Sequence, residues 1–179
     1  MNVPQMPWMS RQEIEIILSF LKPEDVMLEY GCGGSTRLFP LYVKEYYSIE
    51  SDPQWAEAVK KIMPNNVKMY SVPVDRPEDP GQKHATKWDE LYTTKMYQAY
   101  RKYIETGSTI NKKFTKVLID GRARPQCARY IYDFIDEDCT IFFHDWHPSR
   151  PHYKSILEKY KVIKETNTGQ MIAILKKKL

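Results

Sequence analysis

The sequence has little cysteine, little net charge and no long apolar run, and each shortage excludes a class of protein. Its three cysteines are scattered without a CxxC spacing, which argues against a disulfide framework or a zinc site and suits a reducing compartment. A net charge of +4 is too small to indicate a nucleic-acid-binding protein. No stretch is long enough to span a membrane, and the N-terminus lacks the apolar core of a signal peptide. We therefore expect a cytoplasmic protein with no membrane span and no nucleic-acid partner.

The length and the first residues of the chain indicate one domain. The 179 residues are enough for one full core, and no repeat or low-complexity segment interrupts them. Ser10 followed three residues later by Glu13 is a capping-box pattern, and the apolar residues behind it predict an amphipathic helix. We expect a single domain over 1–179, with 1–22 forming a segment and a helix that pack on its sheet.

The segment 26–37, VMLEYGCGGSTR, is the clearest sign of a ligand site. Its first three residues predict a short buried strand. Three glycines then follow within four positions, and glycine lets a ligand approach the backbone closely. Ser35 and Thr36 are suitable N-cap residues for a helix that leaves this turn. The strand, turn and helix start predict a nucleotide-type cofactor site, although Thr36 stands where a dinucleotide fingerprint requires glycine.

The rest of the chain alternates predicted strands and helices. Strands are expected at 45–50, 67–74, 116–120, 139–143, 162–163 and 170–175, with helical segments at 38–42, 53–62, 88–106, 124–134 and 149–160 and a loop at 76–81. Asn167-Thr168-Gly169 is a short-hairpin signal between the last two strands. This order predicts an α/β fold with a doubly wound sheet that contains one antiparallel strand.

Two acidic residues frame the glycine turn. Glu29 stands two places before the first glycine, and Glu50 ends the next predicted strand. With these two residues and the glycine turn, the chain resembles class I S-adenosylmethionine (SAM)-dependent methyltransferases. The order of its predicted strands and helices extends this resemblance over nearly the whole chain. The resemblance implies a Rossmann-like seven-stranded sheet with a C-terminal antiparallel hairpin strand, and SAM as cofactor with S-adenosylhomocysteine as product. It places Glu29 at the amino-acid end of SAM, Glu50 at the ribose and Asp75 near the adenine. The expected cofactor-binding residues are Glu29, Gly31, Gly33, Ser35, Thr36, Glu50, Ser51 and Asp75.

Three further polar residues follow predicted strands. Asp120 ends the fourth strand, and His144 and Asp145 end the fifth. Ligands of open α/β sheets bind beyond the carboxyl ends of the strands. Methyl transfer to a hydroxyl requires a base, and each of the three is a candidate; we expect Asp120 near the transferred methyl group and the other two facing the acceptor. The two aspartates would also suit Mg²⁺, and the sequence leaves metal dependence open.

Donor-rich and aromatic residues after these strands predict the acceptor site. They suit a polyhydroxylated ligand, although the same mixture also fits a solvated loop. The expected acceptor-binding residues are Arg122, Arg124, Trp146, His147, Arg150 and Tyr153.

The segments LEYGCGGSTR, SIESDPQW, LIDGRARPQCA and FFHDWHPSRPHY together resemble a narrower group of O-methyltransferases associated with glycan synthesis. That group includes enzymes that methylate deoxyhexoses, such as rhamnose, on the glycans of large algal viruses. The resemblance implies a glycan or sugar acceptor, and the host cytoplasm if the protein is viral. The alternatives are a phenolic or polyketide acceptor, an RNA or protein acceptor, an NAD-dependent oxidoreductase and a non-catalytic nucleotide-binding module.

Overall fold

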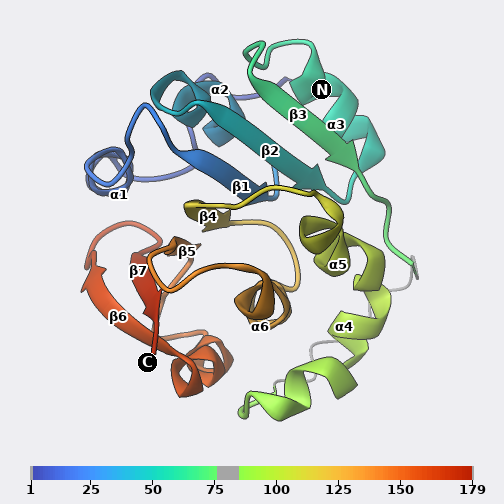
Figure 1. The fold of residues 1–179 in the computed structure, drawn as a ribbon, viewed down its shortest axis with the longest axis vertical. Helices are drawn as coiled ribbons and strands as arrows, with labels where there is room; N and C mark the ends of the chain where they lie inside the picture. Colours follow the sequence, from blue (N-terminus) through green and yellow to red (C-terminus); the bar gives the residue numbers. More distant parts are fainter. Residues whose placement is uncertain (1, 76–84, 179) are drawn as a thin grey trace.

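A computed structural model describes residues 2–75 and 85–178 and contains one seven-stranded sheet (Figure 1). The strands are β1 (Val26–Tyr30), β2 (Glu45–Glu50), β3 (Val67–Ser71), β4 (Lys116–Ile119), β5 (Thr140–His144), β6 (Tyr160–Glu165) and β7 (Ile172–Lys177). Their order across the sheet is β3-β2-β1-β4-β5-β7-β6. Neighbours from β3 to β5 pair in parallel, whereas β7 is antiparallel to both β5 and β6. The predicted doubly wound sheet with one antiparallel strand is confirmed.

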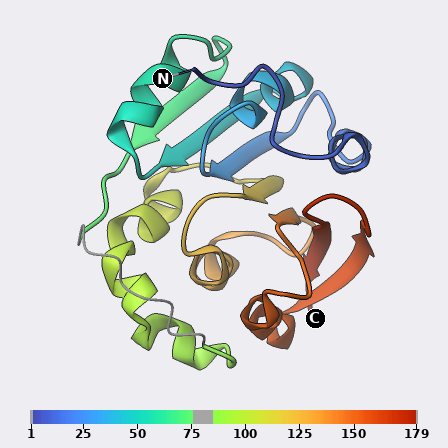
Figure 2. The same ribbon diagram turned by 180° about the vertical axis from the view of Figure 1, so that it is seen from behind.

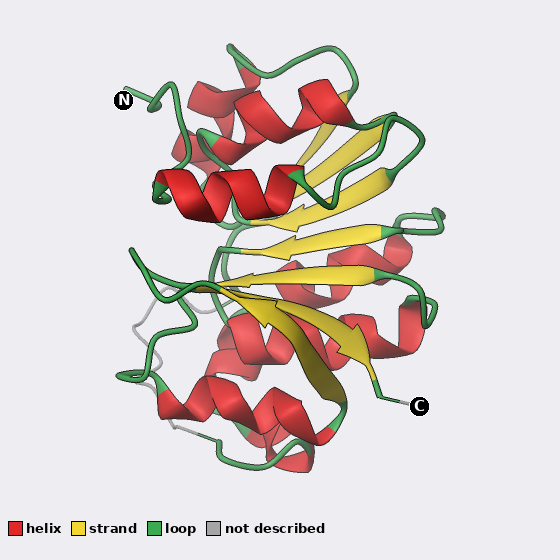
Figure 3. Cartoon of the chain, turned by 90° about the vertical axis from the view of Figure 1, so that its left-hand side faces the viewer, coloured by secondary structure: helices red, strands yellow, loops and turns green. Residues whose placement is uncertain are grey.

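Helices cover both faces of this sheet (Figures 2 and 3). The α-helices are α1 (Arg11–Leu18), α2 (Ser35–Leu38), α3 (Pro53–Lys60), α4 (Lys95–Ala99), α5 (Arg101–Thr109) and α6 (Arg124–Ile131). The 3₁₀ helices are η1 (Phe39–Tyr42), η2 (Asp89–Thr93), η3 (Tyr132–Phe134) and η4 (Pro151–Glu158). Met27 of β1 packs with α1 and η1 on one face, and its neighbour Leu28 packs with α5 and α6 on the other. The central strands are apolar throughout because both of their faces are buried.

The N-terminal region follows the prediction. Ser10 caps α1, and a complete capping box with Glu13 is present. The described residues before α1, 2–10, form no helix or strand and pass so close to the glycine turn that a Cβ on Gly34 would lie 2.1 Å from the carbonyl oxygen of Met6.

Three expected elements differ from the structure. The third strand ends at Ser71 rather than at residue 74. The segment 88–106 is not one helix, because the chain breaks at Thr94, whose hydroxyl caps α4, and again at Tyr100. The segment 149–160 forms a 3₁₀ helix only over Pro151–Glu158, and Tyr160 already begins β6. The predicted loop at 76–81 lies outside the described residues.

The parallel strands end together at one edge of the sheet, which lies on the left in Figure 3. The loops after β1, β2, β4 and β5 meet there, and the N-terminal segment covers part of them. None of the described helices has both the length and the apolar character needed to cross a membrane.

Candidate active site

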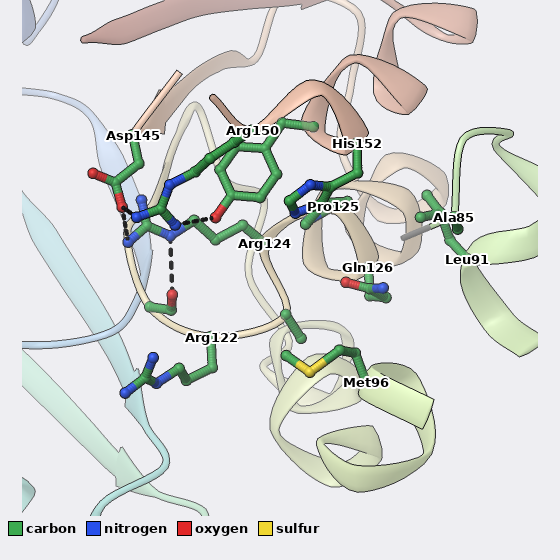
Figure 4. A pocket seen from close by; sticks show the side chains of 13 residues that line it. Ala85, Leu91, Met96, Arg122, Arg124, Pro125, Gln126, Asp145, Arg150 and His152 are labelled. Atoms are coloured by element: carbon green, nitrogen blue, oxygen red, sulfur yellow. Dashed lines mark hydrogen bonds and ion pairs between the residues drawn. The ribbon is translucent and has the colours of Figure 1, made fainter. Parts of the chain in front are cut away.

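Two adjoining cavities open at the carboxyl edge of the sheet. The larger, about 420 Å³, is lined by the glycine turn, the loop after β2 and the N-terminal segment. The smaller, about 150 Å³, lies between α6, η4 and the region of η2 and α4 (Figure 4). Four residues line both: Gly121, Arg122, Arg124 and Asp145. The larger cavity is within the range of small-molecule sites, and the shared lining residues show that the smaller one lies next to it.

Two glycines allow the loops after β1 and β4 to meet beside the larger cavity. Gly31 has a φ of 91°, and a Cβ there would lie 2.6 Å from the Cα of Gly121. An added side chain would therefore push the two loops apart. The glycine-rich turn is required by this close approach as well as by any ligand.

Glu29 lies beneath the turn and does not line the larger cavity. Its carboxylate accepts hydrogen bonds from the hydroxyls of Ser35, Thr36 and Ser48, the last two at 2.7 Å. Burial raises the pKa of Glu29 to about 7, and the three hydroxyl donors oppose that rise. Ser35 and Thr36 were expected to cap the helix; that is wrong, because Gly34 holds the N-cap position. Glu29 thus holds the turn in shape, and its direct contact with a cofactor stays a prediction.

Glu50 reaches the wall of the larger cavity. Its Oε2 accepts from the backbone N–H of Cys32 at 2.9 Å, and its Oε1 accepts from those of Ser51 and Asp52 at 2.7 and 2.8 Å. The carboxylate therefore ties the loop after β1 to the loop after β2 and is held in one orientation. Ser51 lines the same cavity.

Asp75 does not reach either cavity. It follows β3 by four residues, accepts from the N–H of Lys102 at 2.9 Å and forms an ion pair with the Lys102 ammonium at 3.1 Å. These contacts hold the start of α5. The structure therefore does not bring Asp75 to the other expected cofactor residues.

The other expected cofactor-binding residues also divide into those that line the larger cavity and those that do not. Gly31, Gly33 and Ser35 line the larger cavity, whereas Thr36 is fully buried behind them. The sequence reasoning missed several lining residues, namely Pro4, Pro7, Trp8, Cys32, Asp52, Trp55 and Gln170. Cys32, Asp52 and Trp55 lie within quoted motif segments but were not chosen as site residues, whereas the other four reach the cavity from loops that only the fold brings together.

His144 lies between two carboxylates. Its Nδ1 is 2.7 Å from Oδ1 of Asp120, and its Nε2 is 3.7 Å from Oε1 of Glu13 on α1. Only 2% of His144 is exposed, and Glu13 is fully buried. Within the described part of the chain, neither Nε2 nor Oε1 has a hydrogen-bond partner. His144 and Asp120 also line the larger cavity, although both ring nitrogens of His144 face carboxylates. The orientation of His144 toward an acceptor stays a prediction.

Arg124 occupies the space between the two candidate aspartates. Its Nη2 is 3.4 Å from Asp120 and 2.9 Å from Asp145, and its Nη1 donates to the carbonyl oxygen of His144 at 2.7 Å. Across the described residues, no group of three or more His, Cys, Asp or Glu side chains could hold a metal. Because the Arg124 guanidinium occupies the space between the two carboxylates and pairs with both, these residues do not fit Mg²⁺.

Asp145 borders both cavities in an unusual backbone conformation. Its φ of 58° is left-handed, which is uncommon for a residue other than glycine. Arg124 and Arg150 both contact Oδ2, at 2.9 and 3.2 Å, so Oδ1 is outside both ion pairs (Figure 4). Arg150 also donates to the Tyr153 hydroxyl at 2.9 Å. This carboxylate is the acidic group common to the two cavities among the residues that line them.

Four of the six expected acceptor residues line the smaller cavity: Arg122, Arg124, Arg150 and Tyr153. Trp146 is 1% exposed, packs edge-on against Phe143 and donates to Glu165 at 3.2 Å. His147 is exposed and pairs with Ser149. Trp146 and His147 therefore line neither cavity.

No protein-family model and no curated protein sequence matches the chain. Solved structures match its fold over most of its length. A methyltransferase-like protein from Silicibacter pomeroyi aligns with a TM-score of 0.65 and 22% identity, over 97% of this chain and 90% of that one. A putative caffeoyl-CoA O-methyltransferase from Staphylococcus aureus aligns with 0.57 and 12%, over 97% and 87%. An rRNA methylase from Streptococcus thermophilus aligns with 0.54 and 11%, over 94% and 95%.

These similarities concern the fold and leave the acceptor open. Because an rRNA methylase is among the matches, the fold gives no support to the expected exclusion of nucleic acid. The narrower likeness to viral glycan enzymes is not shown by these comparisons. The chain has the seven-stranded Rossmann-like fold of methyltransferases.

Proposed function

We propose that the chain is a SAM-dependent O-methyltransferase that methylates a sugar hydroxyl. The observation that carries this proposal is the junction of the two cavities at Asp145 and Arg124. A cofactor in the larger cavity and an acceptor in the smaller one would meet there. Such binding would bring the acceptor hydroxyl to the methyl group, and this positioning is what an in-line displacement requires.

The assignment of SAM as the cofactor is supported by the volume of the larger cavity and by the fixed carboxylate of Glu50 in its wall. SAM would supply an electrophilic methyl group on its sulfonium. The backbone of the turn from Gly31 to Ser35 would hold the cofactor, and Glu50 with Ser51 would bind the ribose hydroxyls. Glu50 is suited to this because three backbone N–H groups already fix its orientation.

Asp145 is our choice of base. Transfer forms an O–C bond to the acceptor and breaks the S–C bond, so the hydroxyl must lose its proton. Oδ1 of Asp145 lies outside the two ion pairs, at the junction of the cavities. Asp120 and His144 would position the loops after β4 and β5 around the methyl group. Arg124 would keep both aspartates in place.

A sugar acceptor is supported by the polar rim and by the sequence resemblance. Arg122, Arg150 and Tyr153 offer donors and one ring to a polyhydroxylated ligand. The apolar side chains of Leu91 and Met96 in the same cavity favour a second candidate, a small phenol. A cytoplasmic location is part of the proposal, because both buried cysteines, Cys127 and Cys139, are free thiols.

The test is incubation with radiolabelled SAM and a panel of deoxyhexosides, phenols and RNA, together with calorimetric titration with S-adenosylhomocysteine and NAD. Label in a sugar would support the full proposal. Label only in phenol or RNA would replace the acceptor and keep the methyltransferase. Binding of NAD without S-adenosylhomocysteine would overturn both, and S-adenosylhomocysteine binding without any transfer would favour a non-catalytic module.

A further inference from the structure

The smaller cavity has two chemically different ends (Figure 4). The end next to the larger cavity carries the ion pairs of Asp145 with Arg124 and Arg150. The far end contains the amide of Gln126 and is otherwise mostly apolar. The apolar residues around it are Ala85, Leu91, Met96 and Pro125. A ligand in this cavity therefore meets charge at one end and the Gln126 amide at the other, and the imidazole of His152 also lines the cavity.

Gln126 carries a buried acceptor that has no partner. Its side chain is 4% exposed, and across residues 2–75 and 85–178 its Oε1 has no hydrogen-bond partner. A buried unpaired carbonyl oxygen is unfavourable. A donor supplied by a bound molecule would remove that penalty.

Thr94 fixes which end of the amide is unpaired. The Thr94 hydroxyl donates its proton to the carbonyl oxygen of Leu91 at 2.9 Å. The same oxygen accepts from the N–H of Tyr97 and from Nε2 of Gln126, both at 3.1 Å. Because the hydroxyl proton is already used, the atom of Gln126 that faces Thr94 must be a donor. The amide cannot be reversed without losing this bond, so Oε1 is the unpaired atom of the Gln126 side chain that borders the cavity.

We propose that Oε1 of Gln126 accepts a hydrogen bond from a hydroxyl or N–H group at the far end of the acceptor. This inference rests on the proposed function, since it takes the smaller cavity as the acceptor site. The substrate class is then a small molecule with two donors, one hydroxyl at Asp145 and a second donor at Gln126. A sugar or a catechol meets this requirement. A molecule whose far end is apolar, or carries only ether, carbonyl or phosphate oxygens, leaves Oε1 unpaired and is rejected.

The experiment compares matched probes on protein saturated with S-adenosylhomocysteine. The probes are methyl rhamnoside and catechol, each with counterparts that are O-methylated so that one hydroxyl remains. Dissociation constants are measured by ligand-observed NMR titration. We expect at least one donor-bearing probe to bind wild type about tenfold or more tightly than its capped counterparts. Gln126→Met should remove this preference, whereas Gln98→Met, on the exposed side of α4, should keep it.

Equal binding of the paired probes to wild type, retention of the preference in Gln126→Met, or failure of both donor-bearing probes to bind would each overturn the inference. If circular dichroism shows that Gln126→Met does not fold, the wild-type comparison decides alone. Titration with S-adenosylhomocysteine separates this result from the proposed function. If wild type binds S-adenosylhomocysteine but binds the paired probes equally, only the role of Gln126 is refuted. If wild type prefers the donor-bearing probe but does not bind S-adenosylhomocysteine, only the proposed methyltransferase activity is refuted.

Discussion

Nδ1 of His144 lies 2.7 Å from Oδ1 of Asp120 because the strands that carry them end side by side. β4 and β5 pair in parallel with Ile119 opposite Phe143, so the next residue of each strand meets its neighbour beyond the sheet. The other nitrogen of His144 faces Glu13, which comes from α1 on one face of the sheet. Two carboxylates and one imidazole thus form a row, buried at Glu13 and His144 and partly exposed at Asp120, that links α1 to the cavity wall.

The first prediction concerns the energetic coupling within this row. We expect a double-mutant cycle of Glu13→Gln and His144→Gln to give a coupling of about 1 kcal/mol or more in the free energy of unfolding. The reason is that removing His144 leaves the buried carboxylate of Glu13 without the imidazole. Urea denaturation of the four proteins measures it. Glu15→Gln, exposed on the same helix, serves as control in a parallel cycle, and additive effects for Glu13 would show that its approach to His144 is incidental.

The second prediction concerns proton removal. Asp145→Asn should lower turnover about 10²–10⁴-fold, because an amide cannot take the proton of the acceptor hydroxyl. Affinity for S-adenosylhomocysteine should change by no more than a few-fold, as Asp145 lies at the junction and not in the glycine turn. Kinetics with the acceptor found in the panel, combined with calorimetry, test both statements. Asp138→Asn, exposed before β5, is the matched control. Wild-type turnover in Asp145→Asn would move the base to another residue.

The third prediction compares two adjacent glycines. Gly34→Ala should cost about 1–3 kcal/mol of stability, since its Cβ would overlap the backbone of Met6 and must displace the N-terminal segment. Gly33→Ala should be tolerated, because its Cβ would meet only Trp55, at 3.8 Å. Thermal denaturation and limited proteolysis of residues 1–9 measure the difference. Equal behaviour of the two variants would show that the N-terminal segment does not lie over the turn in solution.

The fourth prediction follows from the pKa of Glu29, which burial raises from 4.5 to about 7. Between pH 4.5 and pH 7 the Glu29 carboxyl group is deprotonated in the unfolded chain and still protonated in the folded chain. The contribution of Glu29 to stability is therefore present below pH 4.5 and falls as the pH rises through 7. Each pKa unit is worth about 1.4 kcal/mol, so the loss is about 3 kcal/mol. Glu29→Gln does not titrate and should lack this loss. Denaturation of both proteins from pH 5 to 8 compares them; parallel curves would contradict the raised pKa.

Short sequence patterns correctly predicted the features that depend on residues close to one another in the chain. The capping box at Ser10, the alternating strands and helices, the closing hairpin and the turn before Gly34 all follow from short-range preferences for backbone conformation and from burial on both faces of a strand. The acidic residue at the end of β2 was also found in this way, since Glu50 binds the backbone of its own loop and of the adjoining turn.

The tertiary structure alone decided where the side chains point. Glu29 lies within β1 and Asp75 follows β3, yet the first is buried among hydroxyls and the second holds the start of α5. Trp146 belongs to the core, whereas Gln126, which was not among the expected site residues, lines a cavity. A side chain's environment is set by partners that are distant in the sequence, such as Glu13 for His144. Because those partners arrive only when the sheet and its helices assemble, short-range patterns locate the edge of the sheet where a site forms but not which residues of that edge compose it.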